Sequence, residues 1–121
     1  MVVAIIGASE DPTKFGNKAV RAYLQRGYDV YPINLRERQI EGLRAYRSVL
    51  DVPVEIDRVS IYLPPEKTLE VLADIAQKGT RELFLNPGSE SDAVIARATE
   101  LGLEPIVACS IVDIGESSSR Y

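Results

Sequence analysis

The fold is decided by the opening stretch Met1-Val-Val-Ala-Ile-Ile-Gly-Ala-Ser-Glu-Asp-Pro-Thr-Lys-Phe-Gly-Asn17. Residues 2–6 form an apolar run long enough for one buried strand, and Gly7 ends it. A polar loop follows and closes at Gly16-Asn17, where a helical pattern begins. A strand, a glycine-bearing loop and a helix N-terminus together form an anion site, because free backbone N–H groups point at the ligand. The stretch therefore predicts a phosphate-bearing ligand.

The rest of the chain alternates predicted strands with predicted helices, and Gly27, Gly79 and Gly102 each end a helix. We expect strands at 2–6, 28–33, 58–63, 82–85 and 105–108, a short edge strand within 42–46, and helices at 17–26, 65–78 and 89–101. Ser89 and Asp92 resemble a capping box for the last helix. This alternation predicts an α/β fold of three layers: a Rossmann-like, doubly wound, mostly parallel sheet of order 3-2-1-4-5 or similar.

Length and composition indicate one domain, which we place at residues 1–115, followed by a frayed tail at 116–121. The net charge of −4 argues against a nucleic-acid partner, and no apolar run could span a membrane. With no export signal and the single cysteine Cys109, a cytoplasmic location is expected. The sequence has no histidine, so Ser-His and Cys-His catalysis are excluded and a metal site is not expected.

Charge is unevenly distributed along the chain. Residues 1–47 hold eight Lys and Arg against five Asp and Glu, whereas the remainder holds six against thirteen. A basic N-terminal portion of an acidic protein fits a local anion site, although chance would produce the same imbalance.

The loops that follow the strands meet at one edge of such a sheet, so they define the expected site. Gly7-Ala8-Ser9 offers backbone N–H groups to a diphosphate, and Lys14 adds a positive charge. The alternative is an ordinary turn with a helix cap. The glycine spacing departs from GxGxxG, which disfavours a conventional dinucleotide site. The loops 63–65 and 86–88 could flank the rest of the ligand, or could be a helix start and a turn.

The strand at 28–33 is followed by Asn34, Arg36 and Arg38, where an NAD site usually has an acidic residue. The arginine fork suits a phosphorylated ribose, as in NADP or in the 3′-phosphate of coenzyme A (CoA). A solvated charged loop is the alternative. Cys109 could approach a ligand thiol or could be a buried small hydrophobe.

The chain resembles the small stand-alone CoA-binding proteins, which are similar to the N-terminal CoA-binding domain of succinyl-CoA synthetase alpha subunits. The segments that carry the resemblance are Ile6-Gly-Ala-Ser9, Pro12 with Lys14, Phe15-Gly-Asn17, Tyr31-Pro-Ile-Asn34, Gly42-Leu-Arg-Ala-Tyr46, Asp57-Arg-Val-Ser60, Leu63-Pro-Pro65, Leu85-Asn-Pro-Gly88 and Cys109. In place of the family's proline after Asn34 this chain has Leu35, so which of the two arginines reaches the 3′-phosphate stays open.

The resemblance implies CoA bound where the strand order reverses. It places Gly7, Ala8, Ser9 and Lys14 at the phosphates, with Phe15, Gly16 and Asn17 in the same loop. It places Asn34 with Arg36 or Arg38 at the adenosine, Leu63 and Pro64 at the middle, and Asn86 and Pro87 along the pantetheine.

We therefore expect a protein that binds CoA or acyl-CoA without catalysis, as a carrier, sensor or regulatory module. An NADP-binding oxidoreductase or a fragment of one, and a partner-binding domain with a vestigial pocket, are the alternatives.

Overall fold

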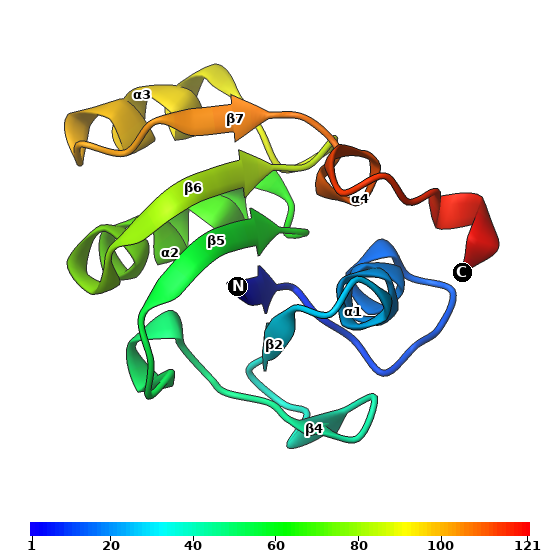
Figure 1. The fold of residues 1–121 in the computed structure, drawn as a ribbon. Helices are drawn as coiled ribbons and strands as arrows, with labels where there is room; N and C mark the ends of the chain where they lie inside the picture. The colour runs from blue at the N-terminus through cyan, green and yellow to red at the C-terminus, as the bar shows by residue number, and fades with distance from the viewer.

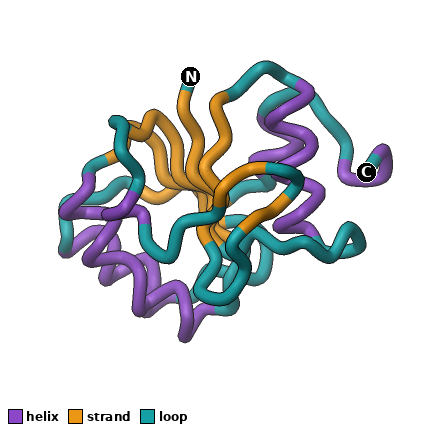
Figure 2. The backbone as a smooth tube through the Cα atoms, turned by 90° about the horizontal axis from the view of Figure 1, so that it is seen from below, coloured by secondary structure: helices purple, strands orange, loops and turns teal.

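A computed structural model describes residues 1–121, and it has three layers, with helices on both faces of a parallel sheet (Figures 1 and 2). The order of elements is β1 (Val2–Ile6), α1 (Phe15–Gln25), β2 (Asp29–Ile33), β3 (Gln39–Ile40), β4 (Leu43–Arg44), η1 (Val49–Asp51), β5 (Ile56–Ile61), α2 (Pro65–Lys78), β6 (Thr80–Leu85), α3 (Asp92–Glu100), β7 (Pro105–Val107), α4 (Ser110–Asp113) and η2 (Ser118–Arg120). The predicted fold class is confirmed.

The central sheet has the order β2-β1-β5-β6-β7, and all four pairings are parallel. The order in which strands are added to the sheet reverses at β1. Strand β2 lies on one side of β1, and β5 lies on the other. The predicted edge strand at 42–46 is reduced to one parallel bridge between Ile33 and Tyr46. Leu43 and Arg44 pair instead with β3 in an antiparallel hairpin, and Glu41-Gly42 at its tip has positive φ at both residues.

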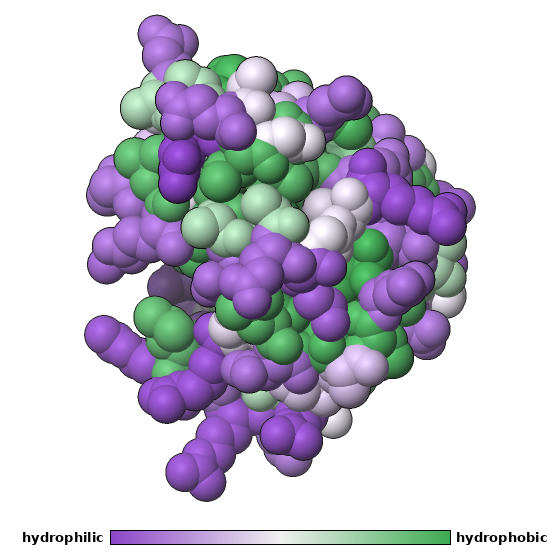
Figure 3. Space-filling model, turned by 90° about the vertical axis from the view of Figure 1, so that its left-hand side faces the viewer, coloured by the Kyte–Doolittle hydropathy of each residue, from purple (hydrophilic) through white to green (hydrophobic).

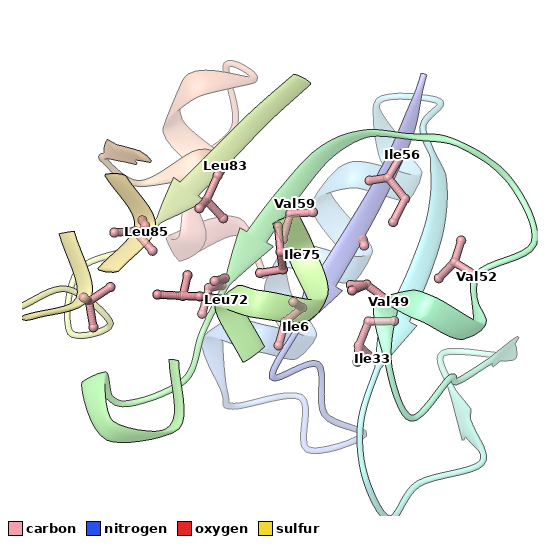
Figure 4. Close-up of a cluster of buried hydrophobic side chains, with 14 residues drawn as sticks. Ile6, Ile33, Val49, Val52, Ile56, Val59, Leu72, Ile75, Leu83 and Leu85 are labelled. Atoms are coloured by element: carbon pink, nitrogen blue, oxygen red, sulfur yellow. The ribbon is translucent and has the colours of Figure 1, made fainter. Parts of the chain in front are cut away.

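Residues of β1 alternate between two separate hydrophobic cores, as a strand buried on both faces requires. Ala4 and Ile6 join the core under α2 and α3, and Val3 and Ile5 join the core under α1 and α4. Figure 4 shows the first core, in which the labelled side chains of Leu72 and Ile75 extend from α2 towards the sheet.

Two local expectations are corrected by the structure. The N-cap of α3 is Ser91, whose side chain accepts a hydrogen bond from the Val94 N–H at 3.1 Å; Ser89 is buried and donates to the Asn86 carbonyl instead. The tail at 116–121 is not frayed, because the buried Glu116 carboxylate pairs with Arg26 at 3.1 Å and with Arg120 at 2.9 Å. These ion pairs hold the tail close to the end of α1.

The strand arrows in Figure 1 point towards α1 and α4. The left side of that view is therefore the edge of the sheet at which the strands begin. Figure 3 shows that edge, on which hydrophilic and apolar side chains are interspersed. None of the helices combines the length and the apolar character needed to cross a bilayer.

Candidate functional site

The carboxyl ends of β1, β5 and β6 open into a cleft of about 480 Å³. The loops after β1 and β5 meet there, as expected for two strands that lie side by side where the order reverses. The lining combines residues from all three loops with one from the segment after β7: Gly7, Lys14, Phe15, Gly16, Tyr62, Leu63, Pro64, Asn86, Pro87, Gly88, Ser89 and Cys109.

Two glycines shape the end of the cleft beside β1 and the start of α1. A Cβ on Gly16 would lie 2.1 Å from the Gly7 carbonyl oxygen, so only glycine lets α1 start this close to the turn after β1. Gly7 has a φ of +86°, and a Cβ there would lie 2.6 Å from the Tyr62 carbonyl oxygen. The strand, the turn and the helix start are therefore packed backbone against backbone, without intervening side chains.

This packing leaves main-chain donors available at the turn and at the helix start. Neither the N–H groups of Ala8 and Ser9 nor those of Phe15 and Gly16 have a hydrogen-bond partner within the protein. The N-cap residue Lys14 makes no side-chain cap, and the first turn of α1 contains no acidic residue. Free N–H groups, the positive end of a helix and a lysine in the cleft lining form a site that favours an anion.

The Gly7 N–H is the exception among the predicted phosphate donors. It donates to the Ile33 carbonyl at 3.3 Å, because the β1–β2 ladder continues one residue past β1. This part of the sequence-based expectation is wrong: Gly7 contributes conformation and close packing at the turn rather than a free N–H group.

Two predicted site residues, Asn17 and Asn34, have their side-chain amides engaged inside the protein. The buried Asn17 amide donates to the Ser9 carbonyl at 2.8 Å and to Glu41, and accepts from Arg21. Asn34 donates to the Ala8 carbonyl at 2.8 Å and accepts from two N–H groups of its own loop. Both side chains therefore hold the turn in shape, and their direct contact with a ligand stays a prediction.

Arg36 and Arg38 lie in a separate hollow of about 400 Å³, which is lined by Leu35, Arg36, Glu37, Arg38, Ala45 and Arg47. None of its three arginines is in an ion pair, in contrast to Arg26, Arg58, Arg81, Arg97 and Arg120 elsewhere. Asn34 connects this loop to the turn after β1 through its bond to Ala8. The structure thus places a cationic hollow beside the turn between β1 and α1 but does not merge it with the main cleft.

The middle and far end of the cleft contain the other predicted residues, Leu63, Pro64, Asn86 and Pro87. Sequence reasoning missed Tyr62, because it was placed inside a strand at 58–63. In the structure β5 ends at Ile61, so Tyr62 is the first residue beyond the strand. Cys109 also lines the cleft and is half-buried.

Lys14, Tyr62 and Cys109 are the only titratable side chains in the lining. Burial raises the pKa of the Tyr62 phenol above its ordinary value, and a hydrogen bond to Ser110 only partly opposes this. The phenol therefore stays protonated at neutral pH. The structure has no cluster of three or more potential metal-ligating side chains.

A comparison with known protein families identifies the family of this chain. A family model described as a CoA binding domain matches residues 1–114, and the chain belongs to that family. It is homologous to the N-terminal CoA-binding domain of the alpha subunit of ADP-forming acetyl-CoA synthetase.

Curated relatives include the alpha subunit of ADP-forming acetate–CoA ligase II from Pyrococcus furiosus, which is 36% identical over 84 residues. The match covers 69% of this chain and 18% of the relative. The ADP-forming acetate–CoA ligase II from Archaeoglobus fulgidus is 40% identical over 81 residues, covering 65% of this chain and 12% of the relative. The chain thus spans less than a fifth of the length of these relatives.

Solved structures show the same fold. A conserved hypothetical protein from Pyrococcus furiosus superposes with a TM-score of 0.84 at 32% identity, covering 92% of this chain and 97% of that one. The dinucleotide-forming acetyl-coenzyme A synthetase 1 from Ca. Korarchaeum cryptofilum, in complex with phosphate and ADP, gives a TM-score of 0.78 at 31% identity. That match covers 88% of this chain and 25% of the synthetase.

Proposed function

We propose that this protein binds CoA or acyl-CoA in the cleft at the end of β1 and acts as a carrier, sensor or regulatory module with no catalysis of its own. Membership of the CoA-binding family supports the ligand. The observation that carries the proposal is a group of free N–H donors: those of Phe15 and Gly16 belong to residues that line the cleft with Lys14, and those of Ala8 and Ser9 belong to the adjoining turn. These donors are suited to a pyrophosphate.

The shape of the site supports a ligand longer than a simple nucleotide. From the phosphate turn the main cleft continues along Leu63 and Pro64 to Asn86 and Pro87, where the lining is largely uncharged. An uncharged arm such as pantetheine matches this part of the cleft. The arginine hollow lies on the adjoining loop, where a ribose 3′-phosphate would complement its unpaired guanidinium groups.

The non-catalytic role is supported by the chemistry of the lining. The cleft contains no carboxylate and the sequence contains no histidine, so the side chains that most often act as general acids and bases do not line it. The acetate–CoA ligase activity printed for the relatives belongs to proteins more than five times longer than the matched part. Location in the cytoplasm is part of the same proposal.

Calorimetric titration of the wild-type protein with CoA, dephospho-CoA, NADP and NAD tests the ligand. CoA should bind most tightly, and at about 100 times its Kd it should stabilise the fold by about 2.7 kcal/mol. Binding of NADP without binding of CoA would contradict the proposal and favour a nicotinamide-dependent enzyme.

The variants Arg36→Gln and Arg38→Gln test the 3′-phosphate contact. Loss of one charge-assisted hydrogen bond should weaken CoA binding about tenfold or more and leave dephospho-CoA unaffected. Arg81→Gln is the matched control, because Arg81 is an exposed arginine at the start of β6, at the opposite edge of the sheet. If CoA and dephospho-CoA bind alike to every variant, the arginine hollow has no role in binding.

A further inference from the structure

A string of polar side chains is buried beneath the far end of the cleft. Ser60 on β5 and Ser110 on α4 are fully buried, and their hydroxyl oxygens lie 2.6 Å apart. Asn86 bonds to Ser60, and the Tyr62 hydroxyl lies 3.2 Å from the Ser110 hydroxyl. Asn86 and Tyr62, the two ends of this string, line the cleft.

The orientation of the Asn86 amide is fixed by backbone groups whose roles cannot be exchanged. Its Oδ1 accepts from the Ser110 N–H at 2.8 Å, and its Nδ2 donates to the Ile61 carbonyl at 2.9 Å. The remaining bond of Nδ2, at 2.8 Å, is therefore a donation to Ser60 Oγ.

The Asn86 donation sets the direction of every hydroxyl that follows. Ser60 Oγ accepts from Asn86, so its own hydrogen has one acceptor available, Ser110 Oγ. Ser110 in turn has one acceptor left for its hydrogen, the Tyr62 oxygen. The opposite direction would leave the buried Ser60 hydrogen without an acceptor, which costs about 1–3 kcal/mol. In the satisfied arrangement the Ser110 hydroxyl, the one side chain hydrogen-bonded to Tyr62, donates to the phenol oxygen, so the Tyr62 hydrogen has no acceptor in that bond; the Ser60 hydroxyl is the other side chain that lowers the pKa of the phenol.

We infer that the Tyr62 hydroxyl donates a hydrogen bond to a carbonyl oxygen on the uncharged arm of the ligand, and that Ser60 and Asn86 fix its direction. This inference rests on the proposed CoA binding. It names the hydrogen bond by which the cleft would recognise the uncharged arm of the ligand. A neutral phenol donor beside Leu63 and Pro64 suits an amide or thioester carbonyl, whereas a thiol sulfur is a weak acceptor. The phosphates are served by the separate N–H donors at the turn.

The raised pKa of Tyr62 agrees with this role, because a phenol that stays protonated remains a donor throughout the neutral range. Ser60 is a positioning residue here. Without its hydroxyl, Tyr62 is free to donate to Ser110 Oγ instead of to the ligand.

The test compares Tyr62→Phe with wild type by calorimetric titration of CoA, acetyl-CoA and adenosine 3′,5′-bisphosphate, which lacks the arm. Tyr62→Phe should weaken CoA and acetyl-CoA binding about three- to tenfold, the range for one neutral hydrogen bond, and leave the bisphosphate unchanged. Ser60→Ala should show the same selectivity without removing any group that lines the cleft. Tyr46→Phe is the matched control, since that tyrosine hydroxyl has no hydrogen-bond partner in the protein and is not part of the string.

The possible outcomes separate the inference from the proposed function. Equal losses for CoA and acetyl-CoA support an amide carbonyl as the acceptor, and a loss for acetyl-CoA alone supports the thioester carbonyl. No loss for either ligand overturns the inference while CoA binding stands. An equal loss for the bisphosphate also overturns it, because the substitution would then have disturbed the whole cleft. If wild type binds none of the three ligands, the proposed function fails and this inference with it.

Discussion

The face of the sheet under α2 and α3 and the face under α1 and α4 bury different kinds of side chain. The first buries a cluster of aliphatic residues, whereas the second buries Arg58, Ser60 and Ser110 beside its apolar residues. Strand β5 contributes to both faces: Val59 and Ile61 join the aliphatic core, whereas Arg58 and Ser60 are buried on the other face.

On the polar face, buried groups are connected from the protein surface to the cleft. Arg58 pairs with Glu82 at 3.0 Å and Asp113 at 2.8 Å, stacks on Phe84, and donates to the Tyr23 hydroxyl. Tyr23 donates to the Ser110 carbonyl, which joins this group to the string beneath the cleft. From this comparison we expect stability and the proposed ligand binding to be separable on the aliphatic face and linked on the polar one.

Leu72→Ala should have the largest effect on stability. Leu72 is fully buried in the aliphatic core, and the cavity left by truncation should lower the free energy of unfolding by about 2–5 kcal/mol. Urea denaturation measures this loss. Titration at a temperature where the variant is folded should give the wild-type affinity for CoA, and a weakened affinity would show that the faces are not separable.

Asn86→Ala should have a smaller effect on stability but should change both properties. The substitution leaves the Ser110 N–H without its acceptor, which should cost about 1–3 kcal/mol, whereas the Ile61 carbonyl keeps its bond from the backbone N–H of residue 86. It also releases the direction of the string, so affinity for CoA should fall more than affinity for adenosine 3′,5′-bisphosphate. Denaturation and titration of the same preparation provide both values. Unchanged CoA affinity would break the link between the polar face and the cleft.

Acid should produce the smallest change, through the tail that packs against α1. The hydrogen bond from Tyr121, together with Arg26 and Arg120, lowers the pKa of Glu116 below its ordinary value of 4.5. A carboxyl group with a lowered pKa stabilises the fold above its unfolded-state pKa, and that contribution is lost as the pH falls through the folded-state value. The melting temperature should therefore decrease when the pH is lowered past about 4.5. Glu116→Gln should reduce this dependence on pH. Identical pH profiles for both proteins would assign the acid sensitivity to other carboxylates.

The sequence predicted the elements whose pattern is local. Val2–Ile6 forms a strand as expected, and glycine at 27, 79 and 102 follows each of the three longer helices. The glycine-bearing turn between β1 and α1 was predicted for the same reason, and phosphate binding there stays a prediction. The predicted helix at 17–26 begins two residues earlier, at Phe15, because the close contact of Gly16 with Gly7 could not be inferred from helical spacing.

The features that depend on contacts distant in the sequence were not predictable. Nothing local shows that Arg26 reaches Glu116, so the tail was expected to fray. The buried string had a signal that could have been used: Arg58 and Ser60 alternate with Val59 and Ile61 in a strand buried on both faces, and Tyr62 continues the alternation just beyond the strand. Such strands are usually apolar throughout, so polar residues at every second position indicate buried partners.

The position of Arg21 has a practical consequence for handling this protein. Its guanidinium donates to the Pro12 carbonyl in the phosphate turn and to the main-chain carbonyl of Tyr121. A purification tag fused after Tyr121 would thus be attached one side chain away from the turn between β1 and α1. Fusion ahead of Met1, which is exposed at the opposite edge of the sheet, keeps added residues away from it.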